Sequence, residues 1–147
     1  MKKKIAVIGY GGQGAWHCTQ LLKSDVAQLA GTYDIAPLRQ QAAKENGIPV
    51  YDSMEAMLDD STVDAVVIAV PNDSHKELVL KALDAGKHVI CEKPVEMSTA
   101  AFDEMTSCAK KNGKLFTVHQ NRRFDVDYLA IKGIVESGEI GDPICIE

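Results

Sequence analysis

The sequence predicts an α/β fold in which a doubly wound, mostly parallel sheet of about six strands carries helices on both faces. Three observations support this prediction. Short apolar segments alternate with segments of helical periodicity along the chain, as in βαβ units. Residues 63–70, VDAVVIAV, are almost all β-branched or alanine, which suits a central strand covered on both faces. A glycine-rich turn follows the first apolar segment, where such folds need a tight turn.

The strands and helices are predicted from local signals. Strands are expected at residues 4–8, 26–33, 48–51, 63–70, 88–91 and 115–119. These segments are short and rich in apolar or β-branched residues, and turn-forming residues separate them from the helices. Helices are expected at about residues 15–22, 37–46, 53–58, 74–84, 98–112 and 126–137. Pro37 occupies a favoured first-turn position, and Gly47 and Gly113 are expected to end helices.

The C-terminal segment is expected to lead into further structure. The helix over residues 126–137 is predicted to bury one apolar face, formed by Tyr128, Ile131, Ile134 and Val135. Residues 144–146 resemble the beginning of a strand that has no room to pair with more chain. We therefore expect the sequence to be a truncated piece of a longer protein.

The composition excludes some classes of partner. The chain has 147 residues, enough for one domain with a core, and is 46% hydrophobic and 25% charged, as in ordinary globular proteins. Its net charge of −5 argues against nucleic acid or an anionic membrane as the main partner. No apolar run approaches the roughly 20 residues that a membrane span needs.

The cysteines give no sign of a metal site or a disulfide framework. Cys18, Cys91, Cys108 and Cys145 are widely separated, with no C-x-x-C pair and no Cys/His cluster at zinc spacing. We therefore expect reduced thiols, no bound metal and a cytoplasmic location.

The glycine-rich turn is a candidate phosphate-binding site. Gly9-Tyr10-Gly11-Gly12-Gln13-Gly14 fits G-x-G-x-x-G between a predicted strand and a predicted helix, and this context gives the pattern its meaning. The first glycine permits the tight turn, the second lets the backbone approach a pyrophosphate, and the third lets the helix pack against the strand. The free N–H groups of the helix start favour an anion.

An acidic residue supports binding of a dinucleotide. Asp34 ends the second predicted strand, 20 residues after Gly14. A carboxylate there can accept hydrogen bonds from the adenosine ribose and repels a 2′-phosphate, which favours NAD over NADP as the cofactor. Arg39 lies five residues further on and could attract a 2′-phosphate, so NADP stays the less favoured alternative.

Four motifs together resemble the Gfo/Idh/MocA family of oxidoreductases. They are GYGGQG at 9–14, VPNDSH at 70–75, CEKP at 91–94, and HQNRRF at 119–124 with ESGEIG at 136–141. The resemblance implies an NAD(P)-dependent dehydrogenase or reductase acting on a hydroxyl carbon of a sugar, inositol or related polyol. It also implies that residues 1–121 form a dinucleotide-binding Rossmann domain. Residues 122–147 would then be the connecting helix and the start of a truncated substrate domain, through which the full-length protein would form a homo-oligomer. The isolated piece is expected to be inactive.

The resemblance assigns the catalytic role to Lys93. Its ammonium would face the substrate hydroxyl beside the nicotinamide, stabilise the developing oxyanion and relay the proton. Glu92 is expected to orient this loop or to contact the nicotinamide side, and Pro94 to fix the bend, often after a cis peptide in this family. Without the resemblance, Lys93 would be an ordinary solvated lysine at the end of a strand.

The loop after the fourth predicted strand is a second candidate cofactor contact. Val70, Pro71 and Asn72 are expected beside the pyrophosphate and the nicotinamide ribose, mainly through their backbone. His75 either contacts the cofactor or packs at the helix start. His119 and Gln120 are expected at the rim of the same cleft, and His17 on a helix face.

Two other functions are compatible with the sequence. A domain of this kind can be a non-catalytic sensor that binds NAD(P) and a protein partner, although Lys93 argues for chemistry. It can also bind an adenine nucleotide or CoA without redox chemistry, which would leave Lys93 unexplained. The spacing Asp84-x-x-x-His88 matches an Asp/His pair of the family, but it precedes the CEKP motif and is treated as a coincidence.

Overall fold

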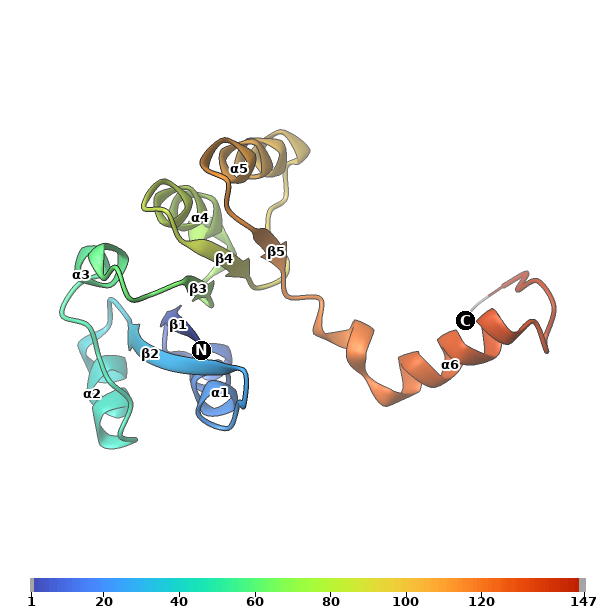
Figure 1. Ribbon diagram of the computed structural model, residues 1–147, viewed down its shortest axis with the longest axis horizontal. Helices are drawn as coiled ribbons and strands as arrows, with labels where there is room; N and C mark the ends of the chain where they lie inside the picture. Colours follow the sequence, from blue (N-terminus) through green and yellow to red (C-terminus); the bar gives the residue numbers. More distant parts are fainter. Residues whose placement is uncertain (1, 146–147) are drawn as a thin grey trace.

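A five-stranded parallel sheet forms the centre of the computed structural model, which describes residues 2–145 (Figure 1). The strands are β1 (Lys3–Ile8), β2 (Ala27–Tyr33), β3 (Ala65–Ile68), β4 (His88–Cys91) and β5 (Phe116–Val118). Their spatial order is β2-β1-β3-β4-β5. Since β2 and β3 lie on opposite sides of β1, the winding direction reverses there. In sheets of this kind the reversal opens a crevice at the carboxyl ends of the strands.

Helices cover both faces of the sheet, as predicted. Figure 1 shows α1 (Gly12–Leu22) and α2 (Pro37–Glu45) on one face, with α4 (His75–Asp84) and α5 (Thr99–Asn112) on the other. The shorter helices are α3 (Met54–Asp59) and the 3₁₀ turns η1 (Asn72–Ser74) and η2 (Asn121–Phe124), and the last helix is α6 (Val126–Ser137). Among residues 2–145, no helix combines the length and the apolarity that crossing a membrane would require.

The two faces of the sheet are packed into two separate cores. Along β1, Ala6 and Ile8 belong to one core and Val7 to the other, because successive strand residues point to opposite faces. The core on the α4 and α5 side is completed by Leu83 and Met105, both fully buried. A strand covered in this way has no polar face, which explains the continuous apolar run predicted as the central strand.

The predicted strand over residues 48–51 is wrong. In its place the structure has a single bridge between Thr32 and Val50, so the sheet has five strands and not six. Thr32 donates its N–H to the carbonyl of Pro49 and accepts one from Tyr51, both at 2.9 Å. Pro49 has no N–H to donate, which limits the pairing of so short an edge segment.

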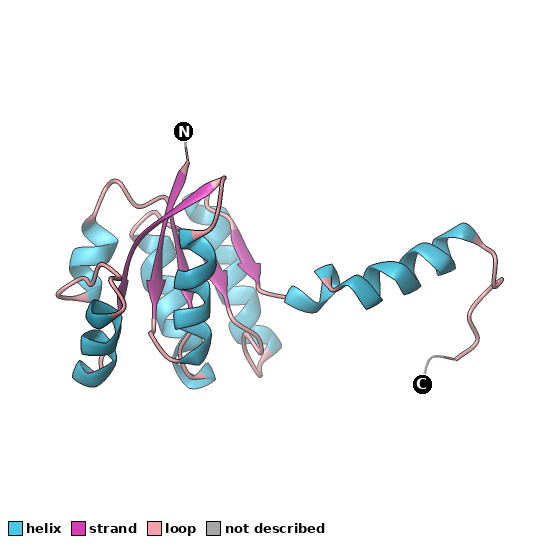
Figure 2. Cartoon of the chain, turned by 90° about the horizontal axis from the view of Figure 1, so that it is seen from below, coloured by secondary structure: helices cyan, strands magenta, loops and turns pink. Residues whose placement is uncertain are grey.

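The predicted burial of the last helix is also wrong. Helix α6 projects away from the sheet (Figure 2), and Tyr128, Ile131 and Ile134 are 41%, 57% and 46% exposed. The chain leaves the sheet after β5 through η2, so the amphipathic helix forms without the sheet as its packing partner. Ile144 and Cys145 form no strand, and Ile146 lies outside the described residues.

The fold makes a prediction about thiol reactivity. Cys18 and Cys91 are buried, and burial raises the pKa of the Cys18 thiol to about 11 and that of Cys91 to about 12. Cys145 is exposed. Because the thiolate is the reactive form, a maleimide at pH 7.5 is expected to modify Cys145 at least about 100-fold faster than Cys91. Mass spectrometry of tryptic peptides measures both rates, and unfolding in urea is the control that should make them similar. Comparable rates in the native chain would contradict the packing around β4.

Candidate functional site

The candidate residues gather at one edge of the sheet. The glycine turn follows β1, Asp34 follows β2, residues 70–72 follow β3, and residues 92–94 follow β4. All neighbouring strands run parallel, so these segments lie together at the carboxyl edge, where ligands bind in open α/β sheets.

The glycine turn is a site of very close backbone packing. Gly9 has a φ of +96°, and a β-carbon on it would lie 2.3 Å from the carbonyl oxygen of Ala69. A β-carbon on Gly14 would lie 2.0 Å from the carbonyl oxygen of Gly9. Neither position has room for a side chain. Helix α1 thus begins in contact with β1, and its N-cap, Gly11, provides no side-chain cap. The first N–H groups of α1 are therefore suited to an anion.

Asp34 ties the end of β2 to the glycine turn. Its Oδ2 accepts the N–H of Tyr10 at 2.7 Å, and its Oδ1 accepts the N–H of Ala36 at 2.8 Å. The Arg39 guanidinium lies 3.4 Å from Oδ2. Because a carboxylate has about four acceptor positions, one position on Oδ1 is left for a further donor. The 4% exposed Asp34 side chain can thus accept a single ligand hydroxyl while it holds the turn.

A cavity of about 590 Å³ opens between the ends of β1, β2 and β3. It is lined by Gly9, Asp34 and the backbone segment Val70–Pro71, together with apolar side chains such as Met54. Its charged lining residues are Asp34, Glu55, Asp73, Glu77, Arg39 and Lys81. With four carboxylates and two cations, the cavity carries a net negative charge.

The loop after β3 is held by a buried histidine. His75 begins α4 and is fully buried, with Nε2 at 3.0 Å from the carbonyl oxygen of Val70 and Nδ1 at 3.1 Å from that of Pro94. Pro71 and Asn72 are exposed at the carboxyl edge, where their backbone is accessible to a ligand. The ring of His75 thus links the loop after β3 to the loop after β4.

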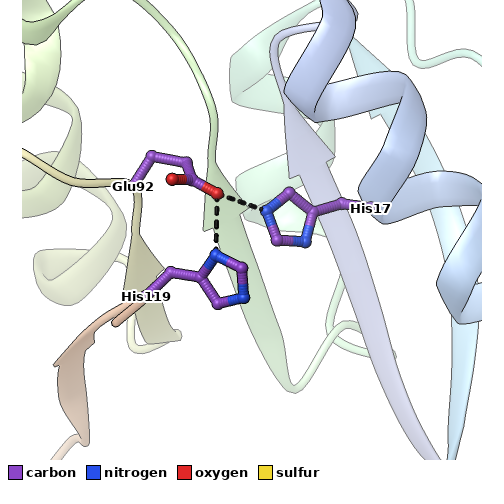
Figure 3. Close-up of side chains that lie close together, drawn as sticks. All are labelled: His17, Glu92 and His119. Carbon is purple, nitrogen blue, oxygen red and sulfur yellow. Dashed lines mark hydrogen bonds and ion pairs between the residues drawn. The ribbon is translucent and has the colours of Figure 1, made fainter. Parts of the chain in front are cut away.

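A three-residue cluster lies beside the loop after β4 (Figure 3). His17 of α1 and His119, which follows β5, point at the same Glu92 oxygen, Oε1. Their ring nitrogens Nε2 and Nδ1 lie 2.7 and 2.8 Å from it. Glu92 and His17 are 6% and 7% exposed. The other carboxylate oxygen of Glu92 accepts the backbone N–H of Lys93 at 3.2 Å, so both of its oxygens are engaged.

The environment of the cluster shifts two pKa values. Burial would raise the pKa of Glu92, but the hydrogen bonds from His17 and His119 outweigh it, so this pKa lies below its ordinary value. Burial lowers the pKa of His17, although the hydrogen bond to Glu92 opposes the shift. Both shifts favour an ionised Glu92 that accepts an N–H bond from the neutral imidazole of His17.

The same three side chains are of the types that bind metal ions. Their ligand atoms lie within 4.8 Å of one another. Ligands at about 2.0–2.1 Å from one tetrahedral ion are separated by about 3.3 Å. The 2.7 and 2.8 Å separations are shorter, and they match hydrogen bonds. The sequence prediction of no metal rested on chain spacing, which could not show that these residues meet.

Lys93 and Pro94 occupy the exposed part of this loop. The Lys93 side chain is exposed at the carboxyl edge, and the Lys93–Pro94 peptide is cis. Gln13 and Gly12, in the turn, are also exposed. The structure therefore places the proposed catalytic amine at the same edge as the glycine turn.

His17 is the functional candidate that the sequence prediction missed. It was expected on a helix face, but it is buried and contacts Glu92. A signal was present, because Gly14, His17 and Cys18 follow i, i+3, i+4 spacing and form the buried side of α1. By contrast, His88 begins β4 at the opposite end from Glu92 and accepts the N–H of Leu115, away from the carboxyl edge.

The glycine turn makes a prediction about stability. Gly14→Ala would force the added β-carbon against the Gly9 carbonyl, so we expect a loss of at least about 2 kcal/mol in the free energy of unfolding. Gly12→Ala is the matched control, because nothing lies within 4 Å of the added carbon. It should be neutral or stabilising by up to about 1 kcal/mol, because alanine favours a helix. Urea unfolding measures both, and equal effects of the two substitutions would contradict the close contact.

The chain matches a known protein family and is similar in sequence to proteins of known activity. A family model, GFO_IDH_MocA, described as "Oxidoreductase family, NAD-binding Rossmann fold", matches residues 3–120. The chain is 36% identical over 142 residues to the myo-inositol 2-dehydrogenase of Thermotoga maritima, covering 95% of this chain and 42% of that protein.

The chain is also similar to solved structures, both in sequence and in fold. An NAD-binding protein from Listeria innocua is 46% identical with a TM-score of 0.91, over 97% of this chain and 42% of that one. The apo scyllo-inositol dehydrogenase of Lactobacillus casei is 32% identical with a TM-score of 0.86, over 96% of this chain and 43% of that one. The chain thus spans less than half the length of these relatives.

Proposed function

This chain belongs to the Gfo/Idh/MocA oxidoreductase family, with its NAD-binding Rossmann fold, and from that premise we propose that it is the cofactor-binding part of a polyol dehydrogenase. The proposed cofactor is NAD, and the proposed substrate class is inositol or a related polyol. Residues 1–121 would form the dinucleotide-binding domain and residues 122–147 the connection to a substrate domain. A homo-oligomeric assembly and a cytoplasmic location stay predictions.

The observation that supports this proposal best is the arrangement of the carboxyl edge. The uncapped start of α1 at Gly11 suits a pyrophosphate, and Asp34 has one free acceptor position for a ribose hydroxyl. The cavity beside them is large enough for an adenosine. Lys93 follows β4, on the side of the switch point where a bound dinucleotide would direct its nicotinamide.

The proposed chemistry needs a cation at Lys93. NAD, when bound, would supply the acceptor for the hydride of the carbinol carbon. The ammonium of Lys93 would stabilise the negative charge that develops on the substrate oxygen and would relay the hydroxyl proton to solvent water. Its exposure leaves the amine free to meet a substrate, while Glu92 and Pro94 are fixed on either side.

Charge favours NAD over NADP. The four carboxylates of the cavity would repel the additional phosphate of NADP, and the two cations, Arg39 and Lys81, do not balance them. Arg39 is already paired with Asp34. A 2′-phosphate would have to compete with that carboxylate for the guanidinium.

Titration with NADH and NADPH, followed by nicotinamide fluorescence, tests the cofactor. NADH is expected to bind at least about tenfold more tightly than NADPH, since like charges close to a site cost more than 1 kcal/mol at low salt. Asp34→Ala should narrow the ratio of the two dissociation constants, and Arg39→Ala should widen it. Raising the salt concentration should also narrow it. Tighter binding of NADPH, or no binding of either cofactor by the folded chain, would contradict the proposal.

A chimera tests the chemistry. This chain would replace the matching 42% of the Thermotoga maritima dehydrogenase, and NADH formation from myo-inositol would be followed at 340 nm. Lys93→Ala is expected to lower kcat by about 10²–10⁴-fold with little change in NADH affinity, because proton transfer and oxyanion stabilisation are lost. Lys132→Ala, in α6, is the lysine control. A chimera that binds NADH but keeps the same kcat in the Lys93→Ala variant would contradict the catalytic role. A chimera that binds NADH without any turnover would favour the alternative function, a non-catalytic NAD(P) sensor.

A further inference from the structure

Three of the four histidines of the chain hold the residues on either side of Lys93. They come from three different elements: His17 from α1, His75 from α4, and His119 from the segment after β5. All three contact the loop after β4, although they are widely separated in the sequence. Such convergence on one exposed lysine calls for an explanation beyond filling the core.

On the amino side of Lys93, the histidines fix a side chain. Oε1 of Glu92 lies 2.7 Å from Nε2 of His17 and 2.8 Å from Nδ1 of His119. Its other oxygen, Oε2, accepts a hydrogen bond from the Lys93 N–H at 3.2 Å. The carboxylate thus has donors from α1 and from the segment after β5 (Figure 3), and a third from the loop itself. Both imidazoles must present an N–H toward Glu92, which fixes their tautomers when the rings are neutral.

On the carboxyl side of Lys93, a histidine fixes the backbone. Nδ1 of His75 lies 3.1 Å from the carbonyl oxygen of Pro94, and Nε2 lies 3.0 Å from that of Val70. His75 is fully buried, and because an imidazole with one N–H can donate only one hydrogen bond, it donates to one of these carbonyls and packs against the other. The loop that carries Lys93 is therefore attached to the loop after β3, which is a proposed cofactor contact.

We propose that His17, His75 and His119 are positioning residues that set the direction of the Lys93 loop through Glu92 and Pro94. The arrangement also links the two ends of the site, because His17 lies one turn after the glycine turn on the same helix, α1. A ligand that shifts the start of α1 will thereby act on Lys93. The inference rests on the proposed function only in taking Lys93 as the group that meets the substrate.

If the three histidines had a purely structural role, the requirements at their positions would differ from those of a positioning role. A core position needs the right volume and a partner for each buried polar atom, from whichever direction that partner comes. A positioning role needs a donor at one particular place. Amide substitutions can distinguish the two roles, because they replace the ring nitrogen that donates. The amide nitrogen of glutamine lies near the position of histidine Nε2, and that of asparagine lies near Nδ1.

The first measurement needs no cofactor. Nitrogen NMR of the imidazoles is expected to show N–H on Nε2 of His17 and on Nδ1 of His119. Hydrogen exchange of the Lys93 amide is expected to speed up about tenfold in His17→Leu and in His119→Leu, because Glu92 loses a donor. His17→Gln and His119→Asn should restore slow exchange. His88→Leu, at the opposite end of β4, is the control that should leave it unchanged.

The second measurement uses NADH. Acetylation of Lys93 is followed by mass spectrometry, with Lys111 as the internal reference. NADH is expected to protect Lys93 about tenfold in the natural chain, in His17→Gln and in His119→Asn. His17→Leu, His119→Leu and His75→Leu are expected to reduce this protection to less than about twofold, with the NADH dissociation constant changed by less than about threefold.

The outcomes separate the two proposals. If the natural chain does not bind NADH, the proposed function fails, and the exchange data alone decide the role of the histidines. If NADH binds but the leucine variants leave Lys93 exchange and protection unchanged, the positioning role is overturned and the function stands. Failure of the glutamine and asparagine variants to restore slow exchange also overturns it. So does stoichiometric Zn²⁺ binding that both His17→Leu and His119→Leu abolish, because the cluster would then be a metal site.

Discussion

The contact between Gly14 and the carbonyl of Gly9 is the constraint on which the site depends. A β-carbon on Gly14 would lie 2.0 Å from that carbonyl oxygen, so α1 can lie against the end of β1 only because residue 14 is a glycine. This approach directs the start of α1 at the crevice beside β1. It also brings His17, one turn later, within reach of Glu92 at the end of β4. This backbone contact thus contributes both to the anion-binding position at the start of α1 and to the contact between His17 and Glu92.

The polar groups of the site are arranged so that each buried charge has partners. Asp34 receives N–H groups from Tyr10 and Ala36, and Glu92 receives two imidazoles and the Lys93 amide. No buried side-chain nitrogen or oxygen within residues 2–145 lacks a hydrogen-bond partner. Because removal of one partner from such a group costs its desolvation energy, both carboxylates are tied to their surroundings. The exposed Lys93 is the contrast: its neighbours are fixed while its own side chain remains accessible.

Local patterns in the sequence were sufficient for the parallel sheet, the helix positions and the glycine turn. The turn motif, the apolar run ending at Val70 and the placement of Pro37 at a helix start each depend on neighbouring residues alone. The family resemblance identified the motif around Lys93, and the comparisons agree with that family.

The remaining features depend on contacts between distant parts of the chain. Residues 48–51 have strand composition, but whether such an edge segment pairs beyond one bridge depends on its neighbour, β2. The apolar face of α6 correctly indicated an amphipathic helix, but periodicity does not say which surface covers it. His17 and Glu92 are 75 residues apart, and no spacing rule relates them. Their meeting follows only from the order of the strands.

The most direct test of the whole account is the amide NMR spectrum of the chain with increasing NADH. The central claim is that one dinucleotide spans the carboxyl edge from the glycine turn to the Lys93 loop. We expect the amide signals of residues 9–14, Asp34, Val70, Asn72 and residues 92–93 to shift together with one dissociation constant, while that of Leu115, at the opposite edge, does not shift. Shifts confined to the glycine turn and Asp34 would contradict the claim, because the cofactor would then occupy the adenosine half without reaching Lys93.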